Sequence, residues 1–381
     1  MTIAHRLTTW AGSWWLRAAI IFILTRIVFV GGFAAAQVAM GRTVSVHDML
    51  VRWDGWWYLF LAEEGYPPEL NLPDRPGYGP WGFFPTWPFS IRGLHFATGL
   101  TFDAAAVVLT LAFGIGFVIV ARMLASEFFG EGAADYAVWL ICLFPGSIAL
   151  TLPYTEPFFL FFAALALWSM SKMRWGLCAL AVFFACLTRS TGVAVIAACG
   201  ILFLISLRRK EWGPILPAMA GAVALLLVGG FAFARTGDPL IWLKAQKQWN
   251  QRLDFGGQLV HWFLVDIPAH TNDYYQYVVM LLSLCFFGLV ILVALFGLRD
   301  GARLPVHVWV YVAVLAFSVF AYSSVGPRPR MLLGMFPLLL LMAVPVSRGA
   351  WSLRAVVAVV FAASSALYSF AIMYEPLHVT A

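Results

Sequence analysis

Residues 51–69 read VRWDGWWYLFLAEEGYPPE and follow the first long apolar block of the chain. Apolar side chains recur at helical spacing from Leu50 to Leu61, and Gly65 stands where a helix C-cap belongs. Three tryptophans in this stretch favour an amphipathic helix that lies in the plane of a membrane interface. This interpretation requires that the rest of the chain spans a membrane.

The composition is that of a membrane protein. Of the 381 residues, 62% are hydrophobic and 11% are charged, whereas soluble proteins carry about 25% charged residues. The apolar residues form blocks of roughly 17–25, the length with which a helix crosses a hydrocarbon core while satisfying its own backbone hydrogen bonds. We predict an all-α polytopic membrane protein with about eleven transmembrane helices, over residues 18–38, 103–122, 134–152, 157–170, 175–188, 191–207, 213–234, 275–297, 306–324, 331–346 and 351–372.

The connections between the spans predict the orientation. Short basic loops stay in the cytoplasm, and such loops join alternate spans at 170–174, 207–212, 298–303 and 347–354. This pattern predicts a cell (plasma) membrane protein with a cytoplasmic N-terminus and a C-terminus outside. The long loops 39–102 and 235–274 then lie outside, with most of the 18 acidic residues.

The two long outer loops show no separate soluble domain, so residues 1–381 are treated as one domain. Residues 77–89, GYGPWGFFPTWPF, mix three prolines and three glycines with aromatic side chains. This composition predicts an irregular, aromatic-lined segment at the membrane surface. The loop 235–274 mixes tryptophans with lysines and an arginine, which predicts a second interfacial helix.

Two aspartates of the first loop have different explanations. Asp48 stands three residues after Ser45, where a capping arrangement at a helix start accounts for it. Asp54 is predicted to lie mid-helix, where the surrounding indoles desolvate its carboxylate and make it a better proton acceptor. The structural alternative is an ion pair with Arg52 or a solvent-facing side chain.

Glu156 begins the predicted fourth span, in LPYTEP (152–157). Thr155 as the cap, Glu156 near the positive helix end and Pro157 in the first turn give a structural explanation. The functional alternative is that Glu156 faces the Asp54 helix at the same membrane level.

Arginines stand at two further outer turns, in TRSTG (188–192) and GPRPRM (326–331). A guanidinium donates two parallel hydrogen bonds to a phosphate, so Arg189, Arg328 and Arg330 are candidates for a phosphate site. The alternative is an arginine that only anchors a span at the interface.

Several other chemistries have no support in the sequence. It contains no HExxH motif, no paired-cysteine motif, no P-loop and no glycine-rich turn between a strand and a helix. His47 and Asp48 are the nearest approach to a metal pair. The five cysteines fall within predicted spans, so we expect no disulfide framework. We also expect no metal, no other cofactor and no nucleic-acid partner.

Five segments together resemble, in order, the motifs of the PIG-V family, whose bacterial members are relatives of GPI mannosyltransferase II. Pro157 stands where the family motif has serine, and Trp87 stands where tyrosine is common. The segments are RWDGWWYLFLAEEGY (52–66), GFFPTWP (82–88), FPGSIALTLPYTEPFF (144–159), LTRSTG (187–192) and RPRMLLGMFPLL (328–339).

The resemblance implies a GT-C fold and a glycosyltransferase with its catalytic site in loop 39–102. It implies transfer of mannose from a polyprenyl-phosphate donor to a glycolipid or other membrane-associated acceptor, by an inverting single displacement with Asp54 as general base. Membrane lipids and an accessory membrane subunit are the other implied partners. The residues expected to bind donor or acceptor are His47, Asp48, Trp53, Trp57, Tyr58, Phe84, Tyr154, Glu156, Arg189, Arg328 and Arg330.

Two other classes of function stay open. A transporter or flippase for a lipid-linked sugar places ionisable groups near the bilayer midplane, and Arg26 is the clearest mid-span charge. A non-catalytic scaffold for a membrane glycosyltransferase is the other alternative. The gathering of carboxylates on the outer face favours the enzyme.

Overall fold

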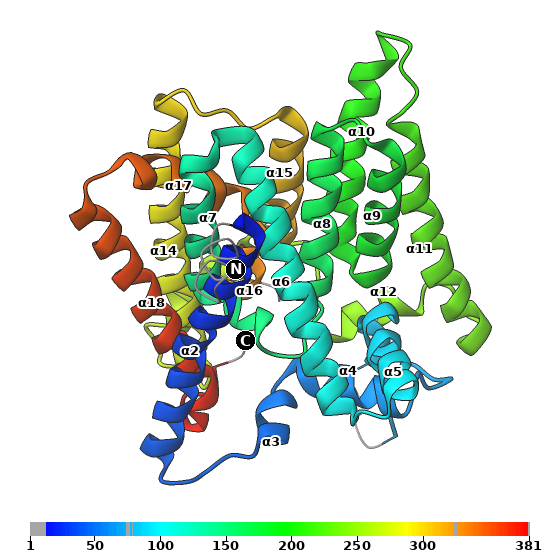
Figure 1. The fold of residues 1–381 in the computed structure, drawn as a ribbon. Helices are drawn as coiled ribbons and strands as arrows, with labels where there is room; N and C mark the ends of the chain where they lie inside the picture. The colour runs from blue at the N-terminus through cyan, green and yellow to red at the C-terminus, as the bar shows by residue number, and fades with distance from the viewer. Residues whose placement is uncertain (1–12, 74–76, 78, 324–325, 380–381) are drawn as a thin grey trace, which may run out of the picture.

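The computed structural model describes residues 13–73, 77, 79–323 and 326–379. Within these ranges every regular element is a helix, apart from an isolated β-bridge between Leu253 and Tyr322 (Figure 1). The predicted all-α membrane fold is therefore confirmed. The N-terminal segment that was predicted to be cytoplasmic lies, up to residue 12, outside the described residues.

The helices follow the predicted spans. Six are long and apolar enough to cross a membrane: α2 (Trp14–Met40), α6 (Phe102–Phe129), α10 (Val193–Leu207) with the turn before it, α11 (Ile215–Thr236), α14 (Tyr274–Arg299) and α18 (Trp351–Met373). Shorter apolar helices are α8 (Glu156–Ser171), α9 (Trp175–Thr188), α15 (Val306–Phe320) and α17 (Pro337–Arg348). Together with α7 (Glu131–Leu143) they occupy every predicted segment. How many of them cross the membrane stays a prediction.

Two of the predicted spans are interrupted next to prolines. The span predicted over 134–152 ends as α7 at Leu143 and continues as the 3₁₀ helix η2 (Pro145–Leu150). The span predicted over 331–346 is split between α16 (Pro329–Leu333) and α17. A proline lacks a backbone N–H and disfavours helical geometry in the residue before it, so a helical ladder restarts there. Both predictions of a continuous span were wrong, because the apolar composition continues through the breaks.

The interfacial elements gather at one end of the bundle. The lower part of Figure 1 holds α3 (Val46–Leu50), α4 (Asp54–Glu63), α5 (Thr86–Thr98) and α12 (Ile241–Gln248), whereas the α10–α11 connection lies at the top. Short basic connections contact their neighbours: the Ser171 hydroxyl lies 3.4 Å from the His307 ring, and Arg348 donates to the Asp300 carbonyl at 3.4 Å.

The core lies mainly between α6, α7, α8, α9, α10 and α17, where alanines and four of the five cysteines allow the helices to approach closely. A second cluster joins α2, α5 and α18 and includes the fully buried side chains of Trp87 and Tyr154. The Trp87 indole donates to the Pro153 carbonyl at 2.9 Å. This bond fixes the backbone just before Glu156 and so positions the start of α8.

Candidate active site

Asp54 is the first residue of α4, not a mid-helix residue as predicted. The helix α3 ends at Leu50, and the chain turns through Trp53, which has a φ of 53°. Gly55 permits this turn because a Cβ there would lie 1.9 Å from the Leu50 carbonyl oxygen. The apolar spacing continues across the break, so periodicity joined two helices into one. The predicted end is confirmed by Gly65, with a φ of 86°. Asp54 thus lies at the positive end of α4.

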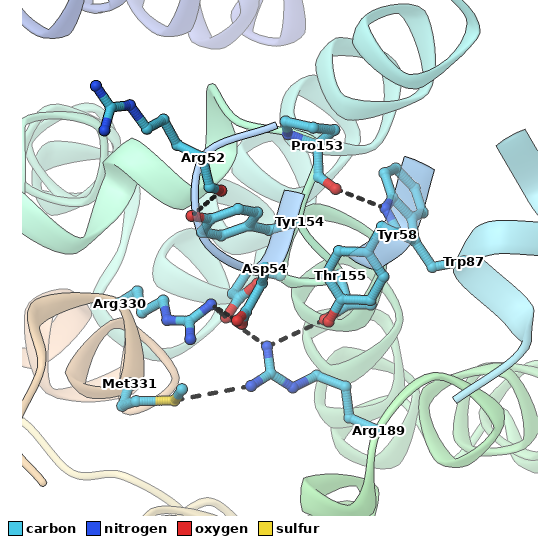
Figure 2. A network of polar contacts seen from close by, with 11 residues as sticks. Arg52, Asp54, Tyr58, Trp87, Pro153, Tyr154, Thr155, Arg189, Arg330 and Met331 are labelled. Carbon is cyan, nitrogen blue, oxygen red and sulfur yellow. Dashed lines mark hydrogen bonds and ion pairs between the residues drawn. The ribbon is translucent and has the colours of Figure 1, made fainter. Parts of the chain in front are cut away.

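Arg330, on α16, joins the two carboxylates that were candidates for chemistry. Its Nη1 lies 2.5 Å from Asp54 Oδ2 and 3.8 Å from Glu156 Oε1 (Figure 2). The side chains of Arg330 and Glu156 are 9% and 4% exposed, so these charges are compensated by one another rather than by water. The alternative pairing of Asp54 is not observed, since Arg52 donates to Glu375 at 2.7 Å. Glu156 therefore lies at the level of Asp54.

Arg189 adds a second guanidinium at the end of α9. Its Nη1 lies 2.5 Å from Glu156 Oε1 and donates to Thr155 Oγ1 at 3.2 Å. The Thr155 side chain does not cap α8 as predicted, because its hydroxyl is shared between Arg189 and the Tyr58 hydroxyl at 3.1 Å. Glu156 Oε1 is held by ion pairs, whereas Oε2 is buried and has no hydrogen-bond partner in the described part of the chain.

Two tyrosines complete the polar cluster. The Arg330 guanidinium lies 5.0 Å from the centre of the Tyr154 ring, and the Tyr154 hydroxyl donates to the Arg52 carbonyl at 3.2 Å. Burial, and then the charge of Asp54, raise the pKa of Tyr58. Tyr58 therefore stays a neutral hydroxyl near pH 7. Asp54 and Glu156 are the two carboxylate side chains of the cluster.

A close backbone contact positions α16. A Cβ on Gly146, in η2, would lie 2.1 Å from the Pro329 carbonyl oxygen, so α16 packs directly on η2. The buried Arg26 donates from α2 to the carbonyls of Ser147 at 2.7 Å and Cys142 at 2.8 Å. The guanidinium therefore satisfies carbonyls at the end of α7 and in η2, and so holds η2 in place. This structural role removes the main support for a transporter, which was a mid-span charge.

Asp54, Glu156, Arg189 and Arg330 line a cavity of about 1550 Å³. Typical small-ligand pockets measure about 300–1,000 Å³, so this cavity has room for more than one small ligand. Its polar part carries Arg189, Arg328 and Arg330 beside the two carboxylates, which favours an anionic ligand. Its apolar part is formed between α8, α10, α11 and α15 by Phe159, Leu160, Val193, Leu225, Val228, Leu315 and Val319.

Most of the predicted binding residues line this cavity: Trp53, Trp57, Tyr58, Phe84, Glu156, Arg189, Arg328 and Arg330. Tyr154 is fully buried behind it. His47 and Asp48 are not among the lining residues. His47 Nδ1 lies 2.8 Å from Asp103 Oδ2, and the Asp48 backbone N–H donates to the Ser45 hydroxyl at 3.0 Å. The capping explanation for Asp48 is confirmed.

The cavity has a further wall that the sequence did not assign to the site. It comes from α12 and the residue after it, through Trp242, Gln246, Lys247 and Trp249. The loop 235–274 contains a helix as predicted, α12, and its position at a membrane interface stays a prediction. Hydrophobic periodicity does not reveal that this loop faces the loop 39–102 across the cavity. The mixture of tryptophan with polar side chains in residues 235–274 was the sequence signal that could have pointed to this wall.

Part of the sequence and the fold resemble known proteins. The family model described as Mannosyltransferase (PIG-V) matches residues 33–212, a range that contains Asp54, Glu156 and Arg189 and ends before Arg330. No curated protein matches this sequence.

Two solved structures are similar in fold. The apo oligosaccharyltransferase of Archaeoglobus fulgidus is 12% identical with a TM-score of 0.52, over 96% of this chain and 56% of that one. ArnT of Cupriavidus metallidurans, bound to undecaprenyl phosphate, is 14% identical with a TM-score of 0.49, over 84% of this chain and 70% of that one. The chain thus spans just over half the length of the archaeal protein. Over residues 33–212 the chain thus resembles the PIG-V family, and its all-helical membrane structure has the GT-C fold of the archaeal protein.

Proposed function

We propose that the chain transfers mannose from polyprenyl-phosphate mannose to a membrane-associated acceptor on the outer face of the cell membrane, with its N-terminus in the cytoplasm. The observation that carries the proposal is one cavity that joins an arginine–carboxylate cluster to an apolar space between membrane helices. A lipid-linked donor needs both, because its phosphate requires cations and its chain requires an apolar surface. The family description supports mannose as the sugar.

The proposed reaction is a single displacement at the anomeric carbon. The Asp54 carboxylate accepts the proton of the acceptor hydroxyl while the acceptor oxygen bonds to that carbon. The bond from the carbon to the phosphate oxygen breaks, and the electron pair leaves with the phosphate, with inversion. Arg330 and Arg189 donate to the phosphate oxygens and stabilise the charge that develops there. Removal of a general base costs about 10²–10⁴-fold in rate.

The donor is tested with the purified chain in lipid nanodiscs. Radiolabelled polyprenyl-phosphate mannose or GDP-mannose is supplied with extracted membrane lipids as acceptors and with EDTA present. We expect label to move from the lipid donor, and polyprenyl-phosphate glucose serves as the control for the sugar. Transfer from GDP-mannose, in a preparation free of the synthase for the lipid donor, contradicts the proposal. No transfer from either donor by the chain alone favours a transporter, a scaffold or a required accessory subunit.

A further inference from the structure

An aromatic wall of the cavity is built from segments that are distant in sequence. Phe83 stacks on Trp57 of α4, with ring centres 5.7 Å apart, and meets Trp249 edge-on at 5.9 Å. Phe84 meets Trp242 of α12 edge-on at 5.7 Å. The rings therefore bind α12 to α4 and present a continuous aromatic surface beside the carboxylate cluster. All five rings line the cavity.

Gln246 and Lys247 are the polar groups that α12 brings to this wall, and Gln246 is only partly satisfied. Its amide nitrogen donates to the Gly82 carbonyl at 3.1 Å. Its amide oxygen is buried without a hydrogen-bond partner among the described residues, although Gln246 lines the cavity. Gly82 lacks a Cβ, which would lie 3.3 Å from the Trp249 indole nitrogen and 3.6 Å from the Gln246 nitrogen. The close approach of backbone and indole fixes the amide at the edge of the aromatic surface.

Other unsatisfied polar atoms lie along the same cavity. The Trp53 indole nitrogen, the Thr191 hydroxyl and Glu156 Oε2 are buried without hydrogen-bond partners in the described ranges, and their residues line the cavity. Buried polar groups are nearly always paired in folded proteins. Such atoms also occur away from the cavity, as in Gln248 and Tyr368, but those of the cavity-lining residues would gain partners from a ligand rich in hydroxyl groups.

We propose that the wall formed by Phe83, Phe84, Trp242, Gln246 and Trp249 is the acceptor subsite and that it takes a pyranose ring, with Gln246 as the specificity-determining residue. A pyranose offers C–H groups on its faces, which pack on indoles, and hydroxyls at its rim, which pair with an amide that both donates and accepts. A simple alkyl alcohol offers a hydroxyl to Asp54 but has no second polar group that could pair with Gln246. The proposal rests on the proposed function in that it names the acceptor of that reaction.

The test measures binding without turnover, in the Asp54→Asn protein in nanodiscs with saturating polyprenyl-phosphate mannose. The probes are octyl α-mannoside and 1-O-octylglycerol, which carry the same alkyl chain with and without a ring. We expect the mannoside to bind more tightly than the octylglycerol. Addition of Gln246→Leu should weaken mannoside binding about 2- to 10-fold, the loss expected for a neutral hydrogen bond, and should leave octylglycerol binding unchanged.

The matched control is Gln248→Leu on the same helix, because the Gln248 amide oxygen is also buried without a partner among the described residues but Gln248 does not line the cavity. Trp242→Leu is a second test of the wall, and its control is Trp212→Leu, which removes an exposed indole in the connection between α10 and α11. Equal binding of the two probes, or equal effects of Gln246→Leu and Gln248→Leu, overturns the subsite. If the mannoside binds more tightly than the octylglycerol but the unmutated chain transfers no sugar, the subsite is retained and the proposed function is rejected. The subsite and the proposed function therefore fail in distinguishable ways.

Discussion

Arg330 and Asp54 come from distant parts of the chain and meet at 2.5 Å in the cavity. We propose that the guanidinium binds the donor phosphate and that the carboxylate is the base. Because the guanidinium and the carboxylate pair with each other, a phosphate that binds the guanidinium would release the carboxylate. Phosphate binding and proton acceptance are therefore coupled through Arg330.

This coupling predicts an ordered reaction in which the donor binds first. Protein loaded with labelled donor and then mixed with acceptor and excess unlabelled donor should convert the bound label in its first turnover. Protein that is loaded with labelled acceptor and then mixed with donor and excess unlabelled acceptor should release the label unreacted, because Asp54 is still paired with Arg330 when the donor arrives. Equal trapping of acceptor and donor would show that Asp54 is available without phosphate.

Asp54→Asn should lower sugar transfer about 10²–10⁴-fold, since the amide keeps the shape but accepts no proton. The change is measured as initial rate with purified protein, alongside the thermal unfolding midpoint. Asp103→Asn is the control, because Asp103 pairs with His47 and does not line the cavity. Transfer near the normal rate in Asp54→Asn would move the base to Glu156.

Arg330→Lys should raise the KM for the donor about 10- to 100-fold, the loss expected for a hydrogen bond to a charged group. A lysine keeps the charge near Asp54 but loses the planar fork that binds a phosphate through two bonds. Arg208→Lys, at an exposed position after α10, controls for the substitution itself. If the donor KM stays the same, Arg330 serves the fold and not the phosphate.

Gly146→Ala should reduce turnover about 100-fold, the loss that follows a misplacement of about 1 Å at a reacting group. The added methyl would lie 2.1 Å from the Pro329 carbonyl oxygen, so α16 must move and carry Arg330 with it. Gly132→Ala, in α7, is the matched control, because a Cβ there meets nothing within 4 Å. Comparable activity of the two variants would show that the η2–α16 contact does not set the site.

Some of the local structure followed from the sequence alone. The Ser45–Asp48 cap, the end of α4 at Gly65 and a helix in the loop 235–274 depend on residues that are close in sequence, and all are present. The break at Trp53 escaped prediction because the apolar spacing continues on both sides of it. The breaks next to Pro145 and Pro337 escaped because long apolar runs predict one continuous span.

The sequence by itself determined the membrane character, the helical segments and the residue types of the candidate site, because hydropathy and capping act within a few turns of chain. The tertiary structure decided which groups meet. The Arg330–Asp54 pair, the position of Glu156 between two arginines and the entry of Gln246 into the cavity depend on helix packing. Packing joins segments through contacts such as Gly146 on Pro329, and no periodicity in a single sequence encodes such a contact.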